Sequence, residues 1–251
     1  MISVVIIGFG NVGLHLYHAF DASSHVQVVQ IASRSTISNL EGTPTTTDLQ
    51  GLKEADLYII SAPDDAIEAI SEQLDFTNRL VVHTSGSVSM ETLSEKNRKG
   101  VFYPLQTFSQ DRAVDFKEIP ICIEADYEED YALLSSLARH ISEKVERVTS
   151  EKRTQLHLAA VFANNFTNHL YHLSDEYLKK HNISFDLLKP LIKETAMKVQ
   201  TLSPSEAQTG PAKRKDRKTI SKHLGLLEQR EYRRIYRSLT KSISKTHGKK
   251  L

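Results

Sequence analysis

The chain has 251 residues, of which 39% are hydrophobic and 25% are charged, and its formal net charge is +1. This length allows two domains, and the composition is typical of a globular protein. The single cysteine, Cys122, excludes an internal disulfide framework and a cysteine-based metal cluster, and its apolar neighbours predict a packing role.

The first predicted element is an apolar strand that runs directly into a glycine-rich turn. Val4–Ile7 are followed by Gly8, Gly10 and Gly13 and then by a helix-forming stretch, the order of a dinucleotide-binding motif. The first glycine allows a tight turn, the second lets a pyrophosphate approach the backbone, and the third lets the helix lie close to the strand. Free N–H groups at the helix start favour the phosphate charge. The alternative interpretation is a tight strand–helix turn without a ligand.

The end of the second predicted strand, residues 26–31, indicates which dinucleotide binds. NAD-binding motifs carry an acidic residue there, whereas no Asp or Glu occurs between Ser33 and Leu40 in this chain. Arg34 between two serines suits the 2′-phosphate of NADP, because guanidinium forms charge-assisted hydrogen bonds to phosphate. We therefore predict NADP, against the alternative of a solvated loop arginine. The residues predicted to bind it are Gly8, Phe9, Gly10, Asn11, Val12, Gly13, Ser33, Arg34, Ser35, Ala62, Pro63 and Thr84.

Strand and helix patterns alternate through the first half of the chain. Such alternation predicts a parallel sheet with helices on its faces, and ligands bind such sheets outside the carboxyl ends of the strands. We expect residues 1–149 to form a Rossmann-like, doubly wound α/β domain that binds NADP. Further strands are expected at 56–61, 79–84, 100–103, 120–123 and 144–149, helices at 64–74 and 127–141, and a polar connection without a full helix at 43–47.

The stretch from Thr154 to Ser174 contains no Asp, Glu, Lys or Arg. Apolar residues recur there at three- and four-residue steps and form one helical face, while asparagines and histidines occupy the other. Uncharged polar residues on this face predict that it is covered and hydrogen-bonded. A membrane span is not expected, because burying these asparagines and histidines in lipid costs too much free energy. We expect the central helix of an all-helical domain, residues 150–251, covered by the first domain and by a second subunit. Further helices are expected at 185–202 and from about residue 216.

Five segments together resemble a known family. They are the glycine turn at 8–13, HTSGS at 83–87, YPLQTF at 103–108, AAVFANNF at 159–166 and TGPAKRKD at 209–216. The chain resembles NADP oxidoreductases that join a Rossmann-like domain to a helical domain of unknown function. That family is similar to the pyrroline-5-carboxylate reductases, ketopantoate reductases and 3-hydroxyisobutyrate dehydrogenases. The resemblance implies a helical domain like the C-terminal domain of 6-phosphogluconate dehydrogenase, a homodimer built through it, and a substrate site between the domains.

The chain departs from the hydroxyacid dehydrogenases of this superfamily at one position. Those enzymes carry a lysine four residues before an asparagine of the central helix, whereas Ala160 and Val161 stand four residues before Asn164 and Asn165. Hydride transfer to a carbonyl needs a proton donor. His157 or Tyr103 could replace the lysine, an imine substrate could arrive protonated, or no hydride transfer occurs. The predicted catalytic residues are His157, Asn165, Ser85 and Tyr103, the predicted substrate-binding residues are Gly86, Asn168 and Arg214, and no metal site is predicted.

Structural alternatives stand beside these roles. Ser85 and Ser87 could cap a helix that starts near Met90, the asparagines could tie helices together, and His157 could be a hydrogen-bonded structural histidine. Arg214 could belong to a solvated basic helix, and His83, within a strand, is expected to be structural.

Three functions follow from these features. The leading hypothesis is an NADP-dependent oxidoreductase that acts on a small carbonyl or imine substrate, and the second is a non-catalytic NADP-binding sensor. The third is nucleic-acid binding through residues 213–250, because residues 211–251 hold 14 Lys/Arg and 3 Asp/Glu. It ranks lowest, because few aromatic residues are interleaved with these charges. The strand that starts at the N-terminus leaves no room for a signal peptide, so we expect a cytoplasmic protein without a membrane segment.

Overall fold

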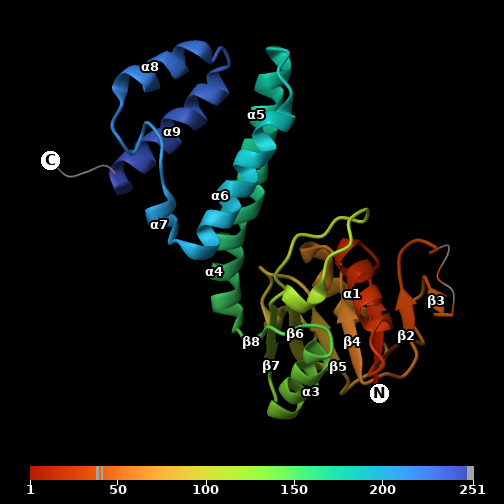
Figure 1. Ribbon diagram of the computed structural model, residues 1–251. Helices are drawn as coiled ribbons and strands as arrows, with labels where there is room; N and C mark the ends of the chain where they lie inside the picture. Colours follow the sequence, from red (N-terminus) through yellow and green to blue (C-terminus); the bar gives the residue numbers. More distant parts are fainter. Residues whose placement is uncertain (38–39, 41, 248–251) are drawn as a thin grey trace. The chain divides into compact units, whose positions relative to one another are not determined.

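The computed structural model describes residues 1–37, 40 and 42–247 and divides into two compact units, residues 1–165 and 166–251. The predicted domain boundary between residues 149 and 150 stays a prediction. The first unit is built on one eight-stranded sheet with the strand order β3-β2-β1-β4-β5-β6-β7-β8 (Figure 1). Its strands are β1 Ile2–Ile7, β2 Val26–Ala32, β3 Thr45–Thr46, β4 Leu57–Ile60, β5 Leu80–His83, β6 Arg98–Pro104, β7 Ile121–Ala125 and β8 Val145–Arg147.

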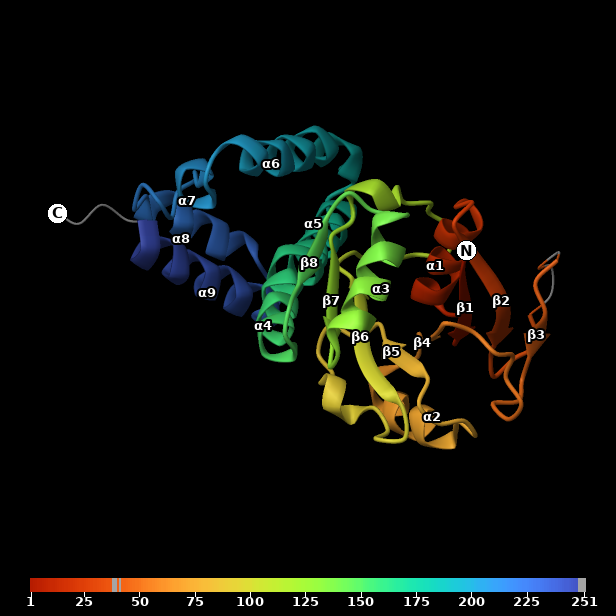
Figure 2. The ribbon, with the colours of Figure 1, turned by 90° about the horizontal axis from the view of Figure 1, so that it is seen from below.

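Both faces of this sheet are buried, as the apolar strands require. Val4 and Ile6 of β1 face one core cluster, while Val5 and Ile7 face another, because side chains alternate along a strand. Helices α1 (Asn11–Asp21) and α3 (Glu128–Arg139) pack on the first face, and α2 (Ile67–Gln73) on the second (Figure 2). The predicted Rossmann-like, doubly wound fold is confirmed.

A third, smaller core cluster lies under helix α4 (Ser150–Ala160). Val101 and Tyr103 of β6 and Cys122 of β7 form this cluster together with Met90, and Leu156 of α4 packs against it. Cys122 is buried and not part of a disulfide, as expected of a packing residue. Helix α4 therefore belongs to the sheet unit and covers the end of the sheet beside β6 and β7.

The sheet differs from the expected parallel arrangement at one pair of strands. β7 runs antiparallel to β6, and β8 is parallel to β7. The connection from β6 to β7 contains a 3-10 turn at Phe116–Glu118 and no α-helix, so it lacks the usual helical crossover between parallel neighbours. The helix expected near Met90 is likewise a single 3-10 turn, Met90–Thr92, and the polar connection at 43–47 holds the short strand β3.

The second unit is all-helical in its described residues, as predicted. A π-helical stretch, Val161–Phe166, continues α4 into α5. None of the helices in the described part of the chain is long and apolar enough to cross a membrane. The helices of this unit are α5 Thr167–Lys180, α6 Lys189–Thr201, α7 Pro204–Ala207, α8 Arg217–Leu226 and α9 Arg230–His247, with a 3-10 turn at Phe185–Leu188.

The glycine turn after β1 holds three elements together. Gly8 has a φ of +98°, and a Cβ atom there would lie 2.1 Å from the Ser61 carbonyl oxygen after β4. A Cβ at Gly13 of α1 would lie 2.2 Å from the Gly8 carbonyl oxygen. At Gly10, by contrast, a Cβ would meet no atom within 4 Å. Packing therefore requires glycine at positions 8 and 13, while the surface at Gly10 is open.

This contrast predicts different effects of two alanine substitutions. Gly13→Ala should destabilise the chain by at least about 2 kcal/mol, because backbone atoms must move to admit the methyl group. Gly10→Ala should cost less than about 1 kcal/mol, because the methyl group meets no atom and only the N-cap preference for glycine over alanine is lost. Urea unfolding followed by circular dichroism measures both, and equal stabilities of the two variants would contradict the packing described here.

Candidate functional site

A cavity of about 860 Å³ lies in the sheet unit at the carboxyl ends of β1, β2 and β4. The glycine turn forms one wall, the segment after β2 another, and the start of the segment after β4 a third. This is where ligands bind in open α/β sheets. Among the residues predicted to bind NADP, those that line the cavity are Gly8, Phe9, Gly10, Ser33, Arg34, Ser35, Ala62 and Pro63.

The start of helix α1 beside this cavity offers unsatisfied backbone donors. Gly10 is the N-cap residue, no side chain caps the helix, and its first turn carries no acidic residue. The first intrahelical hydrogen bond runs from Leu14 N–H to the Gly10 carbonyl oxygen, at 2.9 Å. The preceding N–H groups therefore have no acceptor within the helix. Together with the helix dipole, they favour an anion at the open surface of Gly10.

Arg34 is the cation in this wall of the cavity. Its side chain is exposed, and no described residue forms a hydrogen bond or ion pair with its guanidinium. Asp48 also lines the cavity, and its carboxylate accepts a hydrogen bond from Gln50 N–H at 2.9 Å. The arginine is therefore free to bind a ligand anion, while the nearby carboxylate is engaged with its own loop.

The remaining predicted cofactor residues lie close by but serve the protein's own packing. Asn11 donates its side-chain N–H to the Phe108 carbonyl oxygen at 3.0 Å, which ties the segment after β6 to the start of α1. Val12 packs against the core and Gly13 against Gly8. Thr84 is buried and donates its N–H to the Ile60 carbonyl oxygen at 3.1 Å.

A second polar group of residues lies where β5 and β6 end, beneath α4. The Tyr103 hydroxyl and His157 Nδ1 are 3.1 Å apart and share a hydrogen bond. Gly86 fits between them, because a Cβ there would lie 2.5 Å from His157 Nδ1 and 2.8 Å from Tyr103 Cζ. Three predicted site residues from separate segments thus meet at one point of the sheet unit.

Burial determines the protonation of Tyr103. Its side chain is 8% exposed, and burial raises the pKa of Tyr103 to about 12. The phenol is therefore a neutral O–H group near pH 7, able to donate or accept a hydrogen bond. The pair of Tyr103 and the half-buried His157 can hold a proton and pass it between two atoms.

The loop after β5 is held by its own serines. The buried Ser85 Oγ accepts hydrogen bonds from Ser87 N–H and Val88 N–H, both at 3.1 Å. Ser87 Oγ donates to a carboxylate oxygen of Asp64, which follows β4. The 3-10 turn at Met90–Thr92 is capped by Ser89 and not by Ser85 or Ser87, so the capping alternative from the sequence is wrong. The catalytic role of Ser85 stays a prediction.

The asparagines of the helical stretch are exposed in the single chain. In an α-helix, Asn164 would lie two turns after His157, since two turns take about seven residues. The π-helical turn at Val161–Phe166 takes more residues than an α-helical turn, so the position expected two turns after His157 moves from residue 164 towards residue 165. Asn168 and the exposed Arg214 belong to the second unit, and their roles stay predictions.

Two charged residues near this site were missed by the sequence analysis. Glu124 of β7 and Arg153 of α4 form an ion pair with an N–O distance of 2.6 Å, and Arg153 is completely buried. In the sequence, Glu124 lies between the apolar run of residues 119–123 and Ala125, and a glutamate at such a position is the signal that could have indicated a buried ion pair. No group of three or more His, Cys, Asp or Glu residues that could hold a metal ion occurs among the described residues.

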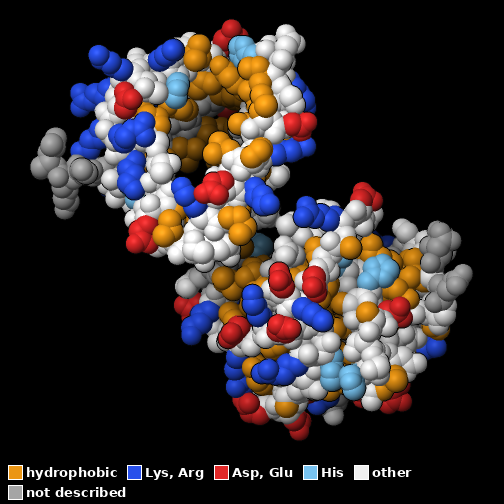
Figure 3. Space-filling view, in the orientation of Figure 1, with side chains coloured by type: hydrophobic (Ala, Val, Ile, Leu, Met, Phe, Trp, Pro, Cys, Tyr) orange, Lys and Arg blue, Asp and Glu red, His pale blue; other side chains and the backbone are white. Residues whose placement is uncertain are grey.

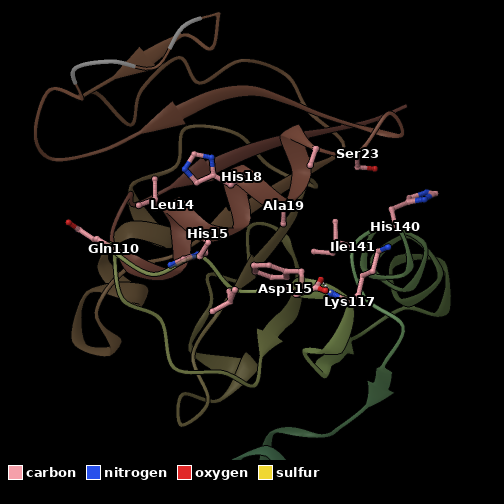
Figure 4. Close-up of a pocket in the computed structure, with 14 residues that line it drawn as sticks. Leu14, His15, His18, Ala19, Ser23, Gln110, Asp115, Lys117, His140 and Ile141 are labelled. Carbon is pink, nitrogen blue, oxygen red and sulfur yellow. Dashed lines mark hydrogen bonds between the residues drawn. The ribbon is translucent and has the colours of Figure 1, made fainter. Parts of the chain in front are cut away.

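Another hollow of about 480 Å³ lies along α1, away from the glycine turn (Figure 4). His18 and Ala19 of α1, Asp115 and Lys117 before β7, and Ile141 after α3 are among its lining residues. His15 also borders it, but its Nε2 is already bonded to the Ser109 carbonyl oxygen at 2.9 Å. The hollow has no glycine turn and no strand end, so it lacks the features of a dinucleotide site.

His83 of β5 is a neutral buried residue next to the Ser85 loop. Its side chain is 0% exposed, and burial, helped by the charge of Arg153, lowers the pKa of His83 to about 4. Nδ1 accepts a hydrogen bond from Ser85 N–H at 3.1 Å, so the ring proton is on Nε2, 3.3 Å from the Ser89 carbonyl oxygen. Protonation of Nδ1 would break the contact with Ser85.

Comparison with protein families gives two matches that together span most of the chain. Residues 1–107 match a Rossmann-like domain, and residues 119–243 match a domain of unknown function, DUF2520. Comparison with curated proteins gives no match. The chain belongs to the family that joins a Rossmann-like domain to a DUF2520 domain, as the resemblance predicted.

Solved structures agree with this assignment. A protein of Bacteroides fragilis, described as a candidate NADP oxidoreductase, is 43% identical, with 97% of this chain and 98% of that chain covered and a TM-score of 0.88. A Thermotoga maritima protein is 23% identical, with coverage of 96% and 97% and a TM-score of 0.72. The 1-pyrroline-5-carboxylate reductase of Streptococcus pyogenes shares the fold at 13% identity, with 98% coverage of both chains and a TM-score of 0.65.

The neutral His83 predicts a loss of stability in acid. The unfolded chain, in which histidine has a pKa of about 6.5, binds this proton more readily than the folded chain, so stability falls as pH decreases through 6.5 towards 4. This group alone should lower the free energy of unfolding by about 2 kcal/mol between pH 8 and pH 5. Urea unfolding across this range should show the increment in the wild type and in a control variant of the exposed His18, His18→Gln, but not in His83→Gln. The same pH dependence in all three would contradict the account.

Proposed function

We propose that this chain is an NADP-dependent oxidoreductase that transfers a hydride to or from a small carbonyl or imine substrate. The observation that carries the proposal is the open surface at Gly10, beside the uncapped start of α1 and within the cavity that Arg34 lines. A relative that is 43% identical, described as a candidate NADP oxidoreductase, supports the same class of reaction.

The residues present fit NADP in three respects. The free N–H groups at the start of α1 would bind the pyrophosphate, and Gly10 leaves room for its oxygens. Arg34, with the hydroxyls of Ser33 and Ser35, would bind the 2′-phosphate, which a carboxylate at this position would repel. Ala62 and Pro63 after β4 would face the part of the cofactor nearest the sheet.

The proton chemistry is assigned to Tyr103 and His157. NADP(H), when bound, supplies or accepts the hydride. A carbonyl that gains a hydride needs a proton, and an alcohol or amine that loses one must release a proton. The neutral Tyr103 hydroxyl, 3.1 Å from His157 Nδ1, gives or takes this proton, and the imidazole replenishes or removes it. This pair takes the place of the absent lysine.

The proposal also covers the substrate side and the assembly. Gly86, Asn165, Asn168 and Arg214 are assigned to the substrate. The homodimer implied by the resemblance is supported by exposed apolar side chains of the helical unit, among them Leu187 and Leu191, which are 72% and 62% exposed. Figure 3 shows hydrophobic side chains around a hollow in this unit, where α5 and α9 line a cavity of about 350 Å³.

Cofactor binding is tested by two variants outside the hydrophobic core. Arg34→Ala should weaken NADPH binding at least about 10-fold, the loss expected for a charge-assisted hydrogen bond to phosphate, and should leave NADH binding unchanged. Gly10→Ala should weaken both cofactors, because its methyl group occupies the space of the pyrophosphate. Calorimetric titration measures these affinities. No binding of either cofactor to the folded wild type would contradict the proposal.

The proton-transfer pair is tested by turnover in a screen of small oxo acids and imines with NADPH. Tyr103→Phe and His157→Gln should each lower kcat by about 100-fold or more, the usual contribution of a general acid. Their affinities for NADPH should stay within about twofold of the wild type, because neither residue lines the cofactor cavity. The exposed Tyr127→Phe is the matched control and should keep full activity. Wild-type turnover in both site variants would refute the assignment, and NADPH binding without any turnover would favour the sensor.

A further inference from the structure

Arg153 is the buried anchor of helix α4. Of the residues of α4, all of which the structure describes, Arg153 alone is buried, and its side chain is 0% exposed. One guanidinium nitrogen, Nη1, donates to Glu124 Oε2 at 2.6 Å. The second terminal nitrogen, Nη2, donates to the Val88 carbonyl oxygen and to Ser150 Oγ, the latter at 3.1 Å, while Nε forms no hydrogen bond with the described residues. One side chain therefore contacts β7, the loop after β5, and the first turn of its own helix.

Glu124 of β7 also binds the first turn of α4 directly. Its carboxylate accepts hydrogen bonds from Ser150 N–H at 2.7 Å and from Ser150 Oγ at 2.6 Å. Ser150 Oγ in turn accepts from Met90 N–H at 3.0 Å. The first turn of α4 is thus attached both to β7 and to the end of the loop after β5.

Simple attachment of the helix does not explain a buried charge at this position. A buried ion pair costs desolvation energy, and apolar side chains of similar volume often stabilise as well or better. What an arginine ion pair provides and apolar side chains do not is directional geometry, because a guanidinium fork fixes the positions and angles of its acceptors. The site beside it has a close fit that needs such precision, since Gly86 leaves no room for a Cβ against His157.

Arg153 lies on the same side of α4 as His157, because residues four apart on a helix are neighbours. On the loop side, its partner Val88 donates its N–H to Ser85 Oγ, in the turn that contains Gly86. We propose that Arg153 is the positioning residue of the site: its guanidinium, held by Glu124, sets α4 and the loop after β5 so that His157 meets Tyr103 beside Gly86. The proposal rests on the proposed function only in taking this pair as the proton-transfer group.

The charge of Arg153 also acts on Tyr103 and on His83. It opposes the burial that raises the pKa of Tyr103, and it adds to the burial that lowers the pKa of His83. The contribution of Arg153 to the site is therefore both geometric and electrostatic.

The test observes the His157 ring directly and needs neither cofactor nor substrate. Long-range proton–nitrogen spectra of the full, nitrogen-15-labelled chain identify the His157 ring signals by their loss in His157→Gln. Tyr103→Phe gives the positions that these signals take without the Tyr103 hydrogen bond. In Arg153→Met the signals should move at least halfway to those positions. The matched control Arg147→Met, at an exposed arginine paired with Glu128, should leave them at the wild-type positions.

Wild-type His157 signals in folded Arg153→Met would overturn the proposal. If that variant does not fold, Arg153→Lys, which keeps the charge but loses the fork, decides the question by the same measurement. Calorimetric titration with NADPH separates this result from failure of the proposed function. The affinity of the arginine variants for NADPH should stay within about twofold of the wild type. If the wild type binds no NADPH, cofactor use is refuted, but the His157 result is unaffected.

Discussion

The close contact between Gly8, Gly13 and Ser61 is the constraint on which the rest of this molecule depends. Two of these positions exclude even a methyl group, since Cβ atoms there would lie 2.1 Å and 2.2 Å from carbonyl oxygens. The turn after β1, the end of β4 and the first turns of α1 are thereby fixed against one another. This places the free N–H groups of α1 beside Gly10, the one glycine of the turn that packing leaves uncovered, and the architecture of the sheet thus produces the surface that is proposed to bind the pyrophosphate.

The group around Tyr103 and His157 depends on polar contacts as well as on the close packing at Gly86. Tyr103 and His157 come from β6 and α4, and the Glu124–Arg153 pair connects the start of α4 to β7 and to the loop after β5. The neutral His83 holds the beginning of the same loop through Ser85. Burial therefore has two consequences here: it keeps Tyr103 and His83 uncharged near pH 7, and it makes the geometry sensitive to single hydrogen bonds.

The elements with a strong pattern could be predicted from sequence, and those decided by tertiary contacts could not. The apolar run before Gly8 and the turn itself identified the Rossmann-like fold. The antiparallel β7 depends on a connection without an α-helix, which strand patterns do not reveal. The π-helical turn at Val161–Phe166 leaves no clear periodic signal in a short segment. Arg153 was missed because a charged residue on a helix usually faces solvent, and only its partner Glu124 in an apolar strand hinted at a buried pair.

The central claim is that the backbone at the start of α1 binds the pyrophosphate of NADP(H). A crystal structure of the full chain with NADPH tests it most directly. The account predicts pyrophosphate oxygens within about 3 Å of the N–H groups that follow Gly10, with the 2′-phosphate at Arg34. A cofactor bound elsewhere, for example in the hollow along α1 that His18 and Lys117 line, would contradict it.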